Sequence, residues 1–396
     1  MFEGLCFLKQ MIMRNWILPE YISDVLPSEA RQIEALRRKV LDLFTCYGYE
    51  QVSPPLIEYV ESLFTQDDSA LDLKTFKLVD ELTGRQMGLR ADITPQVARI
   101  DAHILNRQGV ARLCYAGSVV NARPEGVLST REPRQIGAEI YGCAGVAADV
   151  EAIELMFESL ALAGLKSPRL DIGHIGLFHA LANEAGLMGH RRAEVFSALQ
   201  QKDLPTIRET TAEIAAELRA ALLLLPSFYG GSEVLIRARA ELPKLPGVTA
   251  ALDSLDQLTA ALELRGLVVH FDLAELRSSY YHTGLVFAAY AHGFTNAVAR
   301  GGRYDSVGEK FGRSRPATGF SMDLREFSSL PFPSLRSGVL APAGDDVALL
   351  AAIRALRSAG EIVMIDLGVF ASEVSIDREL KWVDARWQVL PLTTAH

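Results

Sequence analysis

The chain has 396 residues, of which 49% are hydrophobic and 22% are charged, and its formal net charge at pH 7 is -9. This composition is typical of a folded protein and excludes a disordered chain, while the acidic balance argues against a broad basic surface for nucleic acid. The length is sufficient for one large domain and a smaller one.

Neither the cysteines nor the apolar segments indicate an extracellular or membrane protein. The four cysteines are far apart, without the paired spacing of a metal or redox site, and we interpret them as reduced core thiols. The first residues lack the pattern of a cleaved signal peptide, and Met11 or Met13 is an alternative start. No uncharged apolar run reaches the roughly 18 residues of a membrane span. We therefore expect a soluble, cytoplasmic protein.

The N-terminal region predicts an extended segment, a helix and an interrupted strand. Residues 16–30 are punctuated by prolines, and Ser28 is a predicted N-cap for a helix that ends at Gly48. A Pro-Pro pair interrupts the strand predicted over residues 49–59, which restricts it to a sheet edge or an interface. The apolar stripe of the helix comprises Ile33, Leu36, Val40, Leu43, Phe44 and Tyr47.

The next part of the chain predicts strands and two helices. A hairpin turn is expected at Thr83-Gly84, and a helix follows near Thr94-Pro95, because proline is favourable in the first helical turn. A further helix, which follows the second of the later strands, is expected to stop at Gly164. These later strands are predicted over residues 111–122, 133–143 and 169–178.

Residues 177–265 are almost wholly helical in pattern, with interruptions at three prolines. Strands resume over residues 266–273 and 284–291. This order predicts an α+β domain over residues 1–327, with one antiparallel sheet and a helical insertion at about 178–265.

A proline- and serine-rich linker over residues 328–338 separates this domain from a small C-terminal extension. The extension, residues 338–396, predicts a β-α-β unit with its helix over residues 345–358. A hairpin with its turn near Asp384 is expected to close it. The fold class is therefore α+β, with a small α/β extension at its C-terminal end.

Familiar catalytic signatures are missing from the sequence: it has no P-loop, dinucleotide-binding fingerprint, nucleophile elbow or HExxH. The eight histidines show no metal-ligand spacing, and we interpret His174 and His179 as core or surface residues. We expect neither a metal site nor a cofactor.

Four polar motifs recur at the ends of predicted strands: LRADIT, REPRQIGAE, ELRSSYYHTG and GGRYD. Together they offer carboxylates and an amide for an ammonium group, an arginine for a carboxylate, and aromatic hydroxyls for a ring, a set that suits a free amino acid. Taken singly, each residue also fits a surface charge or a strand-end hydrogen bond. Gln135 and Glu139 are four residues apart, which places both on one face of a strand. The motif residues are Arg90, Asp92, Thr94, Arg131, Gln135, Glu139, Arg277, Tyr281, His282, Thr283, Arg303, Tyr304 and Asp305.

In this order the motifs resemble the catalytic domain of histidyl-tRNA synthetase over residues 15–327. LRADIT is similar to that family's Leu-Arg-Pro-Glu-Gly-Thr, with Asp92 in place of its glutamate, and REPRQIGAE is similar to Arg-Glu-Phe-x-Gln-x-Gly-x-Glu. The segment HFDLAELRSSYYHTGLVF brings Arg277 onto the family's characteristic arginine, and GGRYD is unchanged. The resemblance implies a class II aminoacyl-tRNA synthetase-like antiparallel sheet flanked by helices, and dimerisation through the helix after Ser28.

The departures from this family concern the residues that hold ATP. Where the family has Phe-Arg-x-Glu, with an arginine for the α-phosphate, this chain has Val-Asn-Ala-Arg at residues 120–123. Where the family's third motif ends in Gly-x-Glu-Arg, this chain has Asp323 at the glycine and Glu326 at the arginine. One such arginine contributes on the order of a thousandfold to a phosphoryl-type reaction, and a carboxylate repels triphosphate. We expect adenylate formation to be negligible.

A synthetase-like fold that keeps an amino-acid pocket and loses its ATP site resembles the regulatory subunits of ATP phosphoribosyltransferase. This resemblance implies a subunit without catalysis of its own. It also implies a hetero-octamer with the short-form catalytic subunit, activation of that subunit, and feedback inhibition by L-histidine in the first step of histidine biosynthesis. The alternatives are an active histidyl-tRNA synthetase and a ligand-free scaffold that binds only a protein partner. The sequence leaves open where the catalytic subunit binds, and whether histidine binds in this pocket or at a subunit interface.

The resemblance also implies roles for individual residues. Asp92, Gln135 and Glu139 are expected to receive the α-ammonium group of histidine, with Thr94 beside them. Arg277 is expected to meet the carboxylate. His282 stands where the family usually has tyrosine. The complete predicted histidine-binding set is Asp92, Thr94, Arg131, Gln135, Glu139, Arg277, Tyr281, His282 and Tyr304, in which Tyr281, His282 and Tyr304 surround the imidazole.

Overall fold

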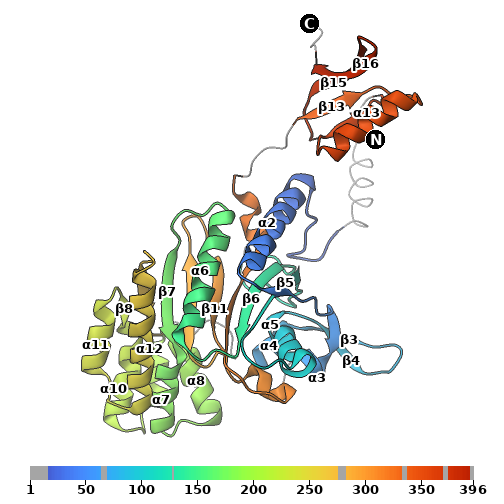
Figure 1. Ribbon diagram of the computed structural model, residues 1–396. Helices are drawn as coiled ribbons and strands as arrows, with labels where there is room; N and C mark the ends of the chain where they lie inside the picture. Colours follow the sequence, from blue (N-terminus) through green and yellow to red (C-terminus); the bar gives the residue numbers. More distant parts are fainter. Residues whose placement is uncertain are drawn as a thin grey trace, which may run out of the picture. The chain divides into compact units, whose positions relative to one another are not determined.

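The structure, a computed structural model, describes residues 17–63, 69–126, 129–274, 282–331, 337–368 and 373–392. The chain divides into two compact units, Met1–Leu330 and Pro331–His396, both drawn in Figure 1. Each has a hydrophobic core of its own, so each is described by itself. No helix within the described ranges is long and apolar enough to cross a membrane.

A nine-stranded sheet forms the centre of the first unit, with the strand order β1-β5-β6-β12-β11-β10-β7-β9-β8. Neighbouring strands of this sheet are antiparallel, apart from the parallel pairs β1–β5 and β7–β9. The predicted α+β class with one mainly antiparallel sheet is confirmed. The strands are β1 (Glu50–Gln51), β5 (Ala111–Ser118), β6 (Arg134–Tyr141), β7 (Arg169–His174), β8 (Tyr229–Gly230), β9 (Val269–Asp272), β10 (Leu285–Tyr290), β11 (Ala299–Arg303) and β12 (Ala317–Asp323).

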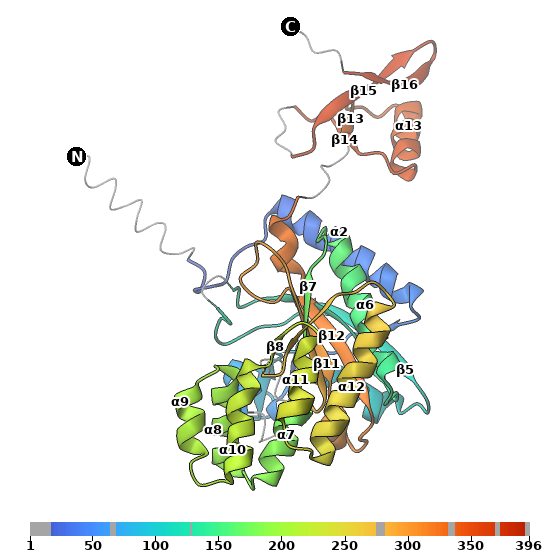
Figure 2. The same cartoon turned by 90° about the vertical axis from the view of Figure 1, so that its left-hand side faces the viewer.

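Three long helices pack on one face of the sheet: α2 (Pro27–Cys46), α6 (Val146–Leu162) and α12 (Pro246–Glu263). Figures 1 and 2 show α2 and α6 side by side. Apolar residues of the three helices and of the strands beneath them share the main hydrophobic core. This face of the sheet is therefore filled, and the opposite face is the one that can carry a ligand site.

Helix α2 buries Leu36 and Val40 of the predicted apolar stripe, but its start differs from the prediction. Ser28 is not the N-cap, because the helix begins at Pro27 and its N-cap is Leu26, which makes no side-chain cap bond. Proline suits the first helical position, since it has no N–H to leave unpaired there. The stop is as predicted, with Gly48 at a positive φ of 80°.

A smaller three-stranded sheet has the order β2-β4-β3. The Pro-Pro pair separates β1 from β2, and both strands are at the edge of their sheets, as predicted from the lack of proline N–H groups. The elements of this region are β2 (Ile57–Tyr59), α3 (Val60–Leu63), α4 (Ser69–Lys74), β3 (Phe76–Val79), β4 (Gln86–Leu89), α5 (Thr94–Arg99) and the π-helical turn η2 (Ile100–Leu105).

The helices between β7 and β9 gather at one end of the unit, as Figure 2 shows. The strand predicted over residues 169–178 ends earlier, at His174, whose ring accepts the N–H of Gly176 and caps the next helix. The insertion also contains β8, which pairs with β9 and extends the sheet. Its remaining elements are α7 (Ile175–Glu184), α8 (Gly189–Gln200), α9 (Leu204–Thr210), α10 (Ala216–Leu224), η3 (Leu225–Ser227) and α11 (Glu233–Glu241); the 3-10 turns η4 (Val307–Phe311) and η5 (Leu324–Ser329) follow later in the chain.

The second unit is a four-stranded sheet of order β14-β13-β15-β16 with one helix. Its first two strands are parallel, which is the β-α-β unit predicted from the sequence. The hairpin turn is at Asp384 and Ala385, both with positive φ. The elements are β13 (Gly338–Ala341), α13 (Val347–Ser358), β14 (Val363–Ile365), β15 (Ile376–Val383) and β16 (Arg386–Pro391).

Candidate functional site

A cleft of about 970 Å³ opens in the first unit. Strand β6 shows which face of the sheet carries it. Ile136 and Ala138 belong to the core beneath the helices, whereas Gln135 and Glu139 line the cleft. Side chains alternate along a strand, so the cleft is on the sheet face opposite the helices. Six of the predicted histidine-binding residues line it: Asp92, Thr94, Gln135, Glu139, His282 and Tyr304.

The deepest of these is Glu139, which is 1% exposed. Three hydroxyl groups surround its carboxylate. Tyr304 donates to Oε2 at 2.5 Å, and Thr94 and Tyr115 donate to Oε1 at 3.1 Å each. Burial raises the pKa of Glu139 to about 8, although the hydrogen bonds from these hydroxyls act in the opposite direction. The site therefore holds a carboxyl group that is ready to accept or lose a proton near neutral pH.

Nearer the mouth of the cleft, Asp92 and Gln135 form a pair. The Gln135 amide donates to Asp92 Oδ1 at 2.9 Å, and its Oε1 accepts the N–H of Ile93 at 2.9 Å. The N–H of Thr94 also donates to Asp92 Oδ1, at 3.0 Å. These bonds fix both side chains against the start of α5. The Asp92 carboxylate and the Gln135 amide are thus preorganised at the rim of the cleft.

His282 and Tyr304 provide the aromatic wall of the cleft. His282 is buried, and its ring meets that of Tyr304 edge to face with centroids 6.2 Å apart. The predicted ligands Arg277 and Tyr281 lie outside the described residues, so they remain predictions from the sequence.

Several side chains of the site and its surroundings lie directly against glycines. A Cβ at Gly319 would overlap the Glu139 carboxylate, one at Gly137 would overlap the Tyr115 hydroxyl, and one at Gly302 would meet the His282 ring. Tyr115 and Gly319 are absent from the predicted set. No signal in the sequence marks these two residues, because only the sheet register places Tyr115 opposite Gly137 and Gly319 opposite Glu139.

Arg131, the remaining predicted ligand, is not among the residues that line the cleft, and its role in histidine binding stays a prediction. Its guanidinium donates to the carbonyl oxygens of Asn121 and Glu20 and lies 4.7 Å from the centre of the Phe76 ring. Its backbone N–H donates to the carbonyl of Tyr21. Arg131 therefore fastens the N-terminal segment to the body of the unit.

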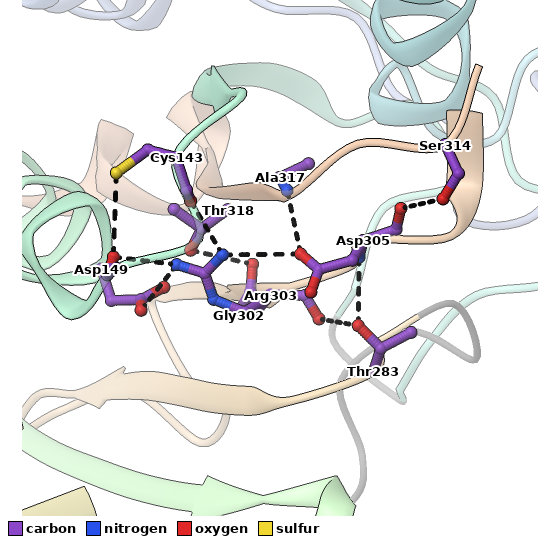
Figure 3. Close-up of polar contacts among 10 residues, drawn as sticks. Cys143, Asp149, Thr283, Gly302, Arg303, Asp305, Ser314, Ala317 and Thr318 are labelled. Atoms are coloured by element: carbon purple, nitrogen blue, oxygen red, sulfur yellow. Dashed lines mark hydrogen bonds and ion pairs between the residues drawn. The ribbon is translucent and has the colours of Figure 1, made fainter. Parts of the chain in front are cut away.

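The arginine and the aspartate of GGRYD are also structural, as Figure 3 shows. Arg303 donates to Asp149 of α6 at 2.8 Å and to the Cys143 carbonyl at 3.0 Å. Asp305 accepts the N–H of Ala317 at 3.0 Å. Burial raises the pKa of Asp149, and its pairing with Arg303 opposes this shift. Arg303, the last residue of β11, therefore bonds α6, whereas Tyr304, which follows the strand, lines the cleft.

The other end of the cleft carries Asp323 and Glu326, the two acidic residues that are expected to replace ATP-binding positions of the synthetase family. Asp323 accepts the N–H groups of Arg134 at 2.8 Å and Arg325 at 3.0 Å, which caps η5. Burial and then the neighbouring Asp323 raise the pKa of Glu326 to about 7. A triphosphate placed here would meet the carboxyl groups of Asp323 and Glu326 and would be repelled by them when they are ionised.

The pKa of Glu139 leads to a prediction about stability and pH. Its pKa is about 8 in the folded chain and close to its ordinary value of 4.5 in the unfolded chain, so folding favours the protonated form. The contribution of Glu139 to stability is therefore complete below about pH 4.5 and is lost as the pH rises towards 8. In Glu139→Gln the free energy of unfolding should depend less on pH over this window. Urea unfolding of both proteins at pH 5, 6.5 and 8 measures this, and equal pH slopes would contradict the assignment.

Comparison with known proteins gives two family matches that together cover most of the chain. Residues 21–327 match the family model described as histidyl-tRNA synthetase. Residues 336–390 match the model described as the ATP phosphoribosyltransferase subunit HisZ C-terminal domain. The second match concerns the small C-terminal unit.

Individual relatives agree with these matches. An ATP phosphoribosyltransferase regulatory subunit from Cupriavidus taiwanensis is 56% identical over 383 residues, which cover 95% of this chain and 99% of the relative. Among solved structures, an ATP phosphoribosyltransferase regulatory subunit/histidyl-tRNA synthetase from Bacillus halodurans is 28% identical, with a TM-score of 0.78 over 90% of this chain and 94% of the other. A histidyl-tRNA synthetase from Nostoc sp. PCC 7120 shares the fold alone, at 18% identity and a TM-score of 0.73 over 92% and 91% of the two chains. The class II synthetase-like fold is thereby confirmed.

Proposed function

Because the chain belongs to the family of ATP phosphoribosyltransferase regulatory subunits, we propose that it activates a short-form catalytic subunit and makes that subunit sensitive to L-histidine. Family membership makes it the regulatory subunit of an enzyme complex of histidine biosynthesis. We further propose that the chain has no catalysis of its own. It dimerises through α2 and joins the catalytic subunit in a cytoplasmic hetero-octamer.

The observation that carries the proposal is a cleft whose two ends differ in chemistry. One end keeps an enclosed carboxyl group, an acid–amide pair and an aromatic wall, and this set of groups suits a histidine molecule. The other end presents carboxyl groups where nucleotide phosphates would lie, which supports a site that binds an amino acid and does not activate it.

The depth of each group supports an arrangement of the ligand. Glu139 is enclosed by hydroxyls next to His282 and Tyr304, so it suits the N–H group of the imidazole ring. Asp92 with Gln135 is nearer the mouth and suits the α-ammonium group, which stays partly solvated. For Glu139 this proposal replaces the role expected from the sequence, which was to receive the α-ammonium group. Arg277 remains the proposed partner of the histidine carboxylate.

An assembly and activity experiment tests the proposed function. The chain and a short-form catalytic subunit, purified separately, are expected to co-elute when mixed. Phosphoribosyl transfer by the catalytic subunit should rise on addition of the chain, and L-histidine should inhibit the complex and not the catalytic subunit alone. Calorimetry should detect histidine binding to the chain or to the complex.

Two outcomes would contradict this assignment. Histidine-dependent exchange of pyrophosphate into ATP by the chain alone would identify an active synthetase. Assembly without any heat from histidine, in the chain and in the complex alike, would identify a scaffold without a ligand.

A further inference from the structure

The end of the cleft around Asp323 and Glu326, which we call the acidic end, contains a buried acceptor without a partner. Asn121 is 3% exposed and lines the cleft. Its Oδ1 atom has no hydrogen-bond partner among the described residues. A buried polar atom left in this state costs about 1–3 kcal/mol. A ligand that donates a hydrogen bond to it would offset that cost.

Glu326 is a second acceptor at this end. Its side chain lines the cleft, and no hydrogen bond or ion pair joins it to another residue in the described part of the chain. The charged groups that act on it are Asp323 on β12, Arg300 on β11, and Glu125 in the loop after β5. Two of these three are acidic, so the local field favours a positive ligand.

The cations at this end of the cleft are already engaged. Lys74 contacts Glu125 at 2.6 Å, and Arg300 contacts the other oxygen of Glu125 at 3.7 Å. These two cations hold the pKa of Glu125 below its ordinary value, although burial acts to raise it. Arg325 also lines the cleft, but its guanidinium donates to the Ser23 hydroxyl at 2.9 Å. Lys74, Arg300 and Arg325 therefore already contact protein groups. The acceptors that remain for a ligand are Asn121 Oδ1 and the Glu326 carboxylate.

Asn121 belongs to the same end of the cleft as these groups. It forms a β-bridge with Thr75, the residue after Lys74, and Lys74 contacts Glu125. Glu125 in turn is one of the charges that act on Glu326. These contacts connect Asn121 with Glu326 through Lys74 and Glu125. The cleft that they line has a volume of about 970 Å³, which exceeds what a single amino acid fills.

We propose that the acidic end of the cleft is a second binding site, separate from the proposed histidine site, for a small organic cation that donates N–H hydrogen bonds. The recognised group is a primary ammonium or a guanidinium. It donates to Asn121 Oδ1 and to the carboxylate of Glu326, with Asp323 contributing to the field. Phosphate-bearing ligands are rejected by the same groups.

Calorimetric titration of the full chain with agmatine, which carries one guanidinium and one primary ammonium, tests this proposal. We expect a dissociation constant below about 1 mM. Glu326→Gln, which keeps the shape and removes the charge, should weaken binding at least about tenfold, and Asn121→Ala should weaken it several-fold. Glu217→Gln, on the exposed face of α10, is the matched control and should bind as the original chain does. Binding should also tighten between pH 6 and 8, because Glu326 ionises near pH 7.

The location of the bound cation is tested separately. Glu139→Gln should leave agmatine affinity within about twofold, and saturating L-histidine should not displace agmatine. Loss of agmatine binding in Glu139→Gln, with Glu326→Gln unaffected, would place the cation in the histidine half and overturn the proposal. No heat from agmatine, or binding of inorganic pyrophosphate in its place, would also overturn it. Neither result would bear on the proposed regulatory function, which is tested by the response of the complex to histidine.

Discussion

Replacing Arg303 with methionine should lower the free energy of unfolding by about 3–5 kcal/mol, because the change leaves a buried carboxylate without its cation. Arg303 and Asp149 are both buried, and the nitrogen and oxygen of the pair are 2.8 Å apart. Arg303 also donates to the carbonyls of Cys143 and Gly145. The pair joins β11 to the first turn of α6, as Figure 3 shows, so the loss affects the sheet and the helix together. Urea unfolding at constant pH measures it.

An exposed arginine with two acidic partners provides the control. Arg239 bonds Asp253 and Asp256 on the surface, and Arg239→Met should cost less than about 1 kcal/mol. The double variant Arg303→Met with Asp149→Leu should recover most of the stability, since it removes both charges from the interior. If Arg303→Met lowered the free energy of unfolding no more than Arg239→Met does, the Arg303–Asp149 pair would not stabilise the fold as a buried ion pair.

Gly319→Ala should weaken histidine binding by about a hundredfold, because the added methyl group would occupy the space of the Glu139 carboxylate. Gly319 is directly opposite Glu139 in the β12–β6 register, and the same Cβ would overlap the carbonyl of Ala138. The carboxylate must then leave its three hydroxyl partners. Such overpacking should also lower the free energy of unfolding by about 1–3 kcal/mol. Calorimetry with L-histidine and urea unfolding measure the two effects.

Gly145→Ala is the matched control for this substitution. Gly145 precedes α6 with an extended backbone that alanine adopts freely, and a Cβ added there would have no other atom within 4 Å. We expect it to leave histidine affinity and stability nearly unchanged. Unaltered histidine binding in a folded Gly319→Ala protein would show that Glu139 takes no part in the site.

Much of the fold was predictable because local patterns and tertiary structure agree. The apolar stripe of α2 is buried where its helical spacing placed it, and the interrupted strand lies at sheet edges, where proline costs least. The start of α2 was not predictable in this way. Leu26 takes the N-cap position in place of Ser28, because the helix begins at Pro27 and proline suits the first helical position.

The site was predictable only in part, since a motif shows which residues are near the cleft and not where each side chain points. Tyr304 and Arg303 are neighbours in GGRYD, yet one lines the cleft and the other bonds α6. Arg131 donates hydrogen bonds to backbone carbonyls. One of them belongs to Glu20, more than a hundred residues earlier in the chain, so the sequence alone does not show this contact. Tyr115 was missed because only strand pairing brings it beside Glu139.

The parallel pairing of β7 with β9 has a consequence for how the protein can change. Two parallel neighbours need a single crossover helix to join them, and α12, which packs against both α6 and β9, already serves that purpose. Helices α8 to α11 are therefore additional to this connection, although their apolar residues extend the main core. Their number and length can change without a change in how β7 and β9 are joined.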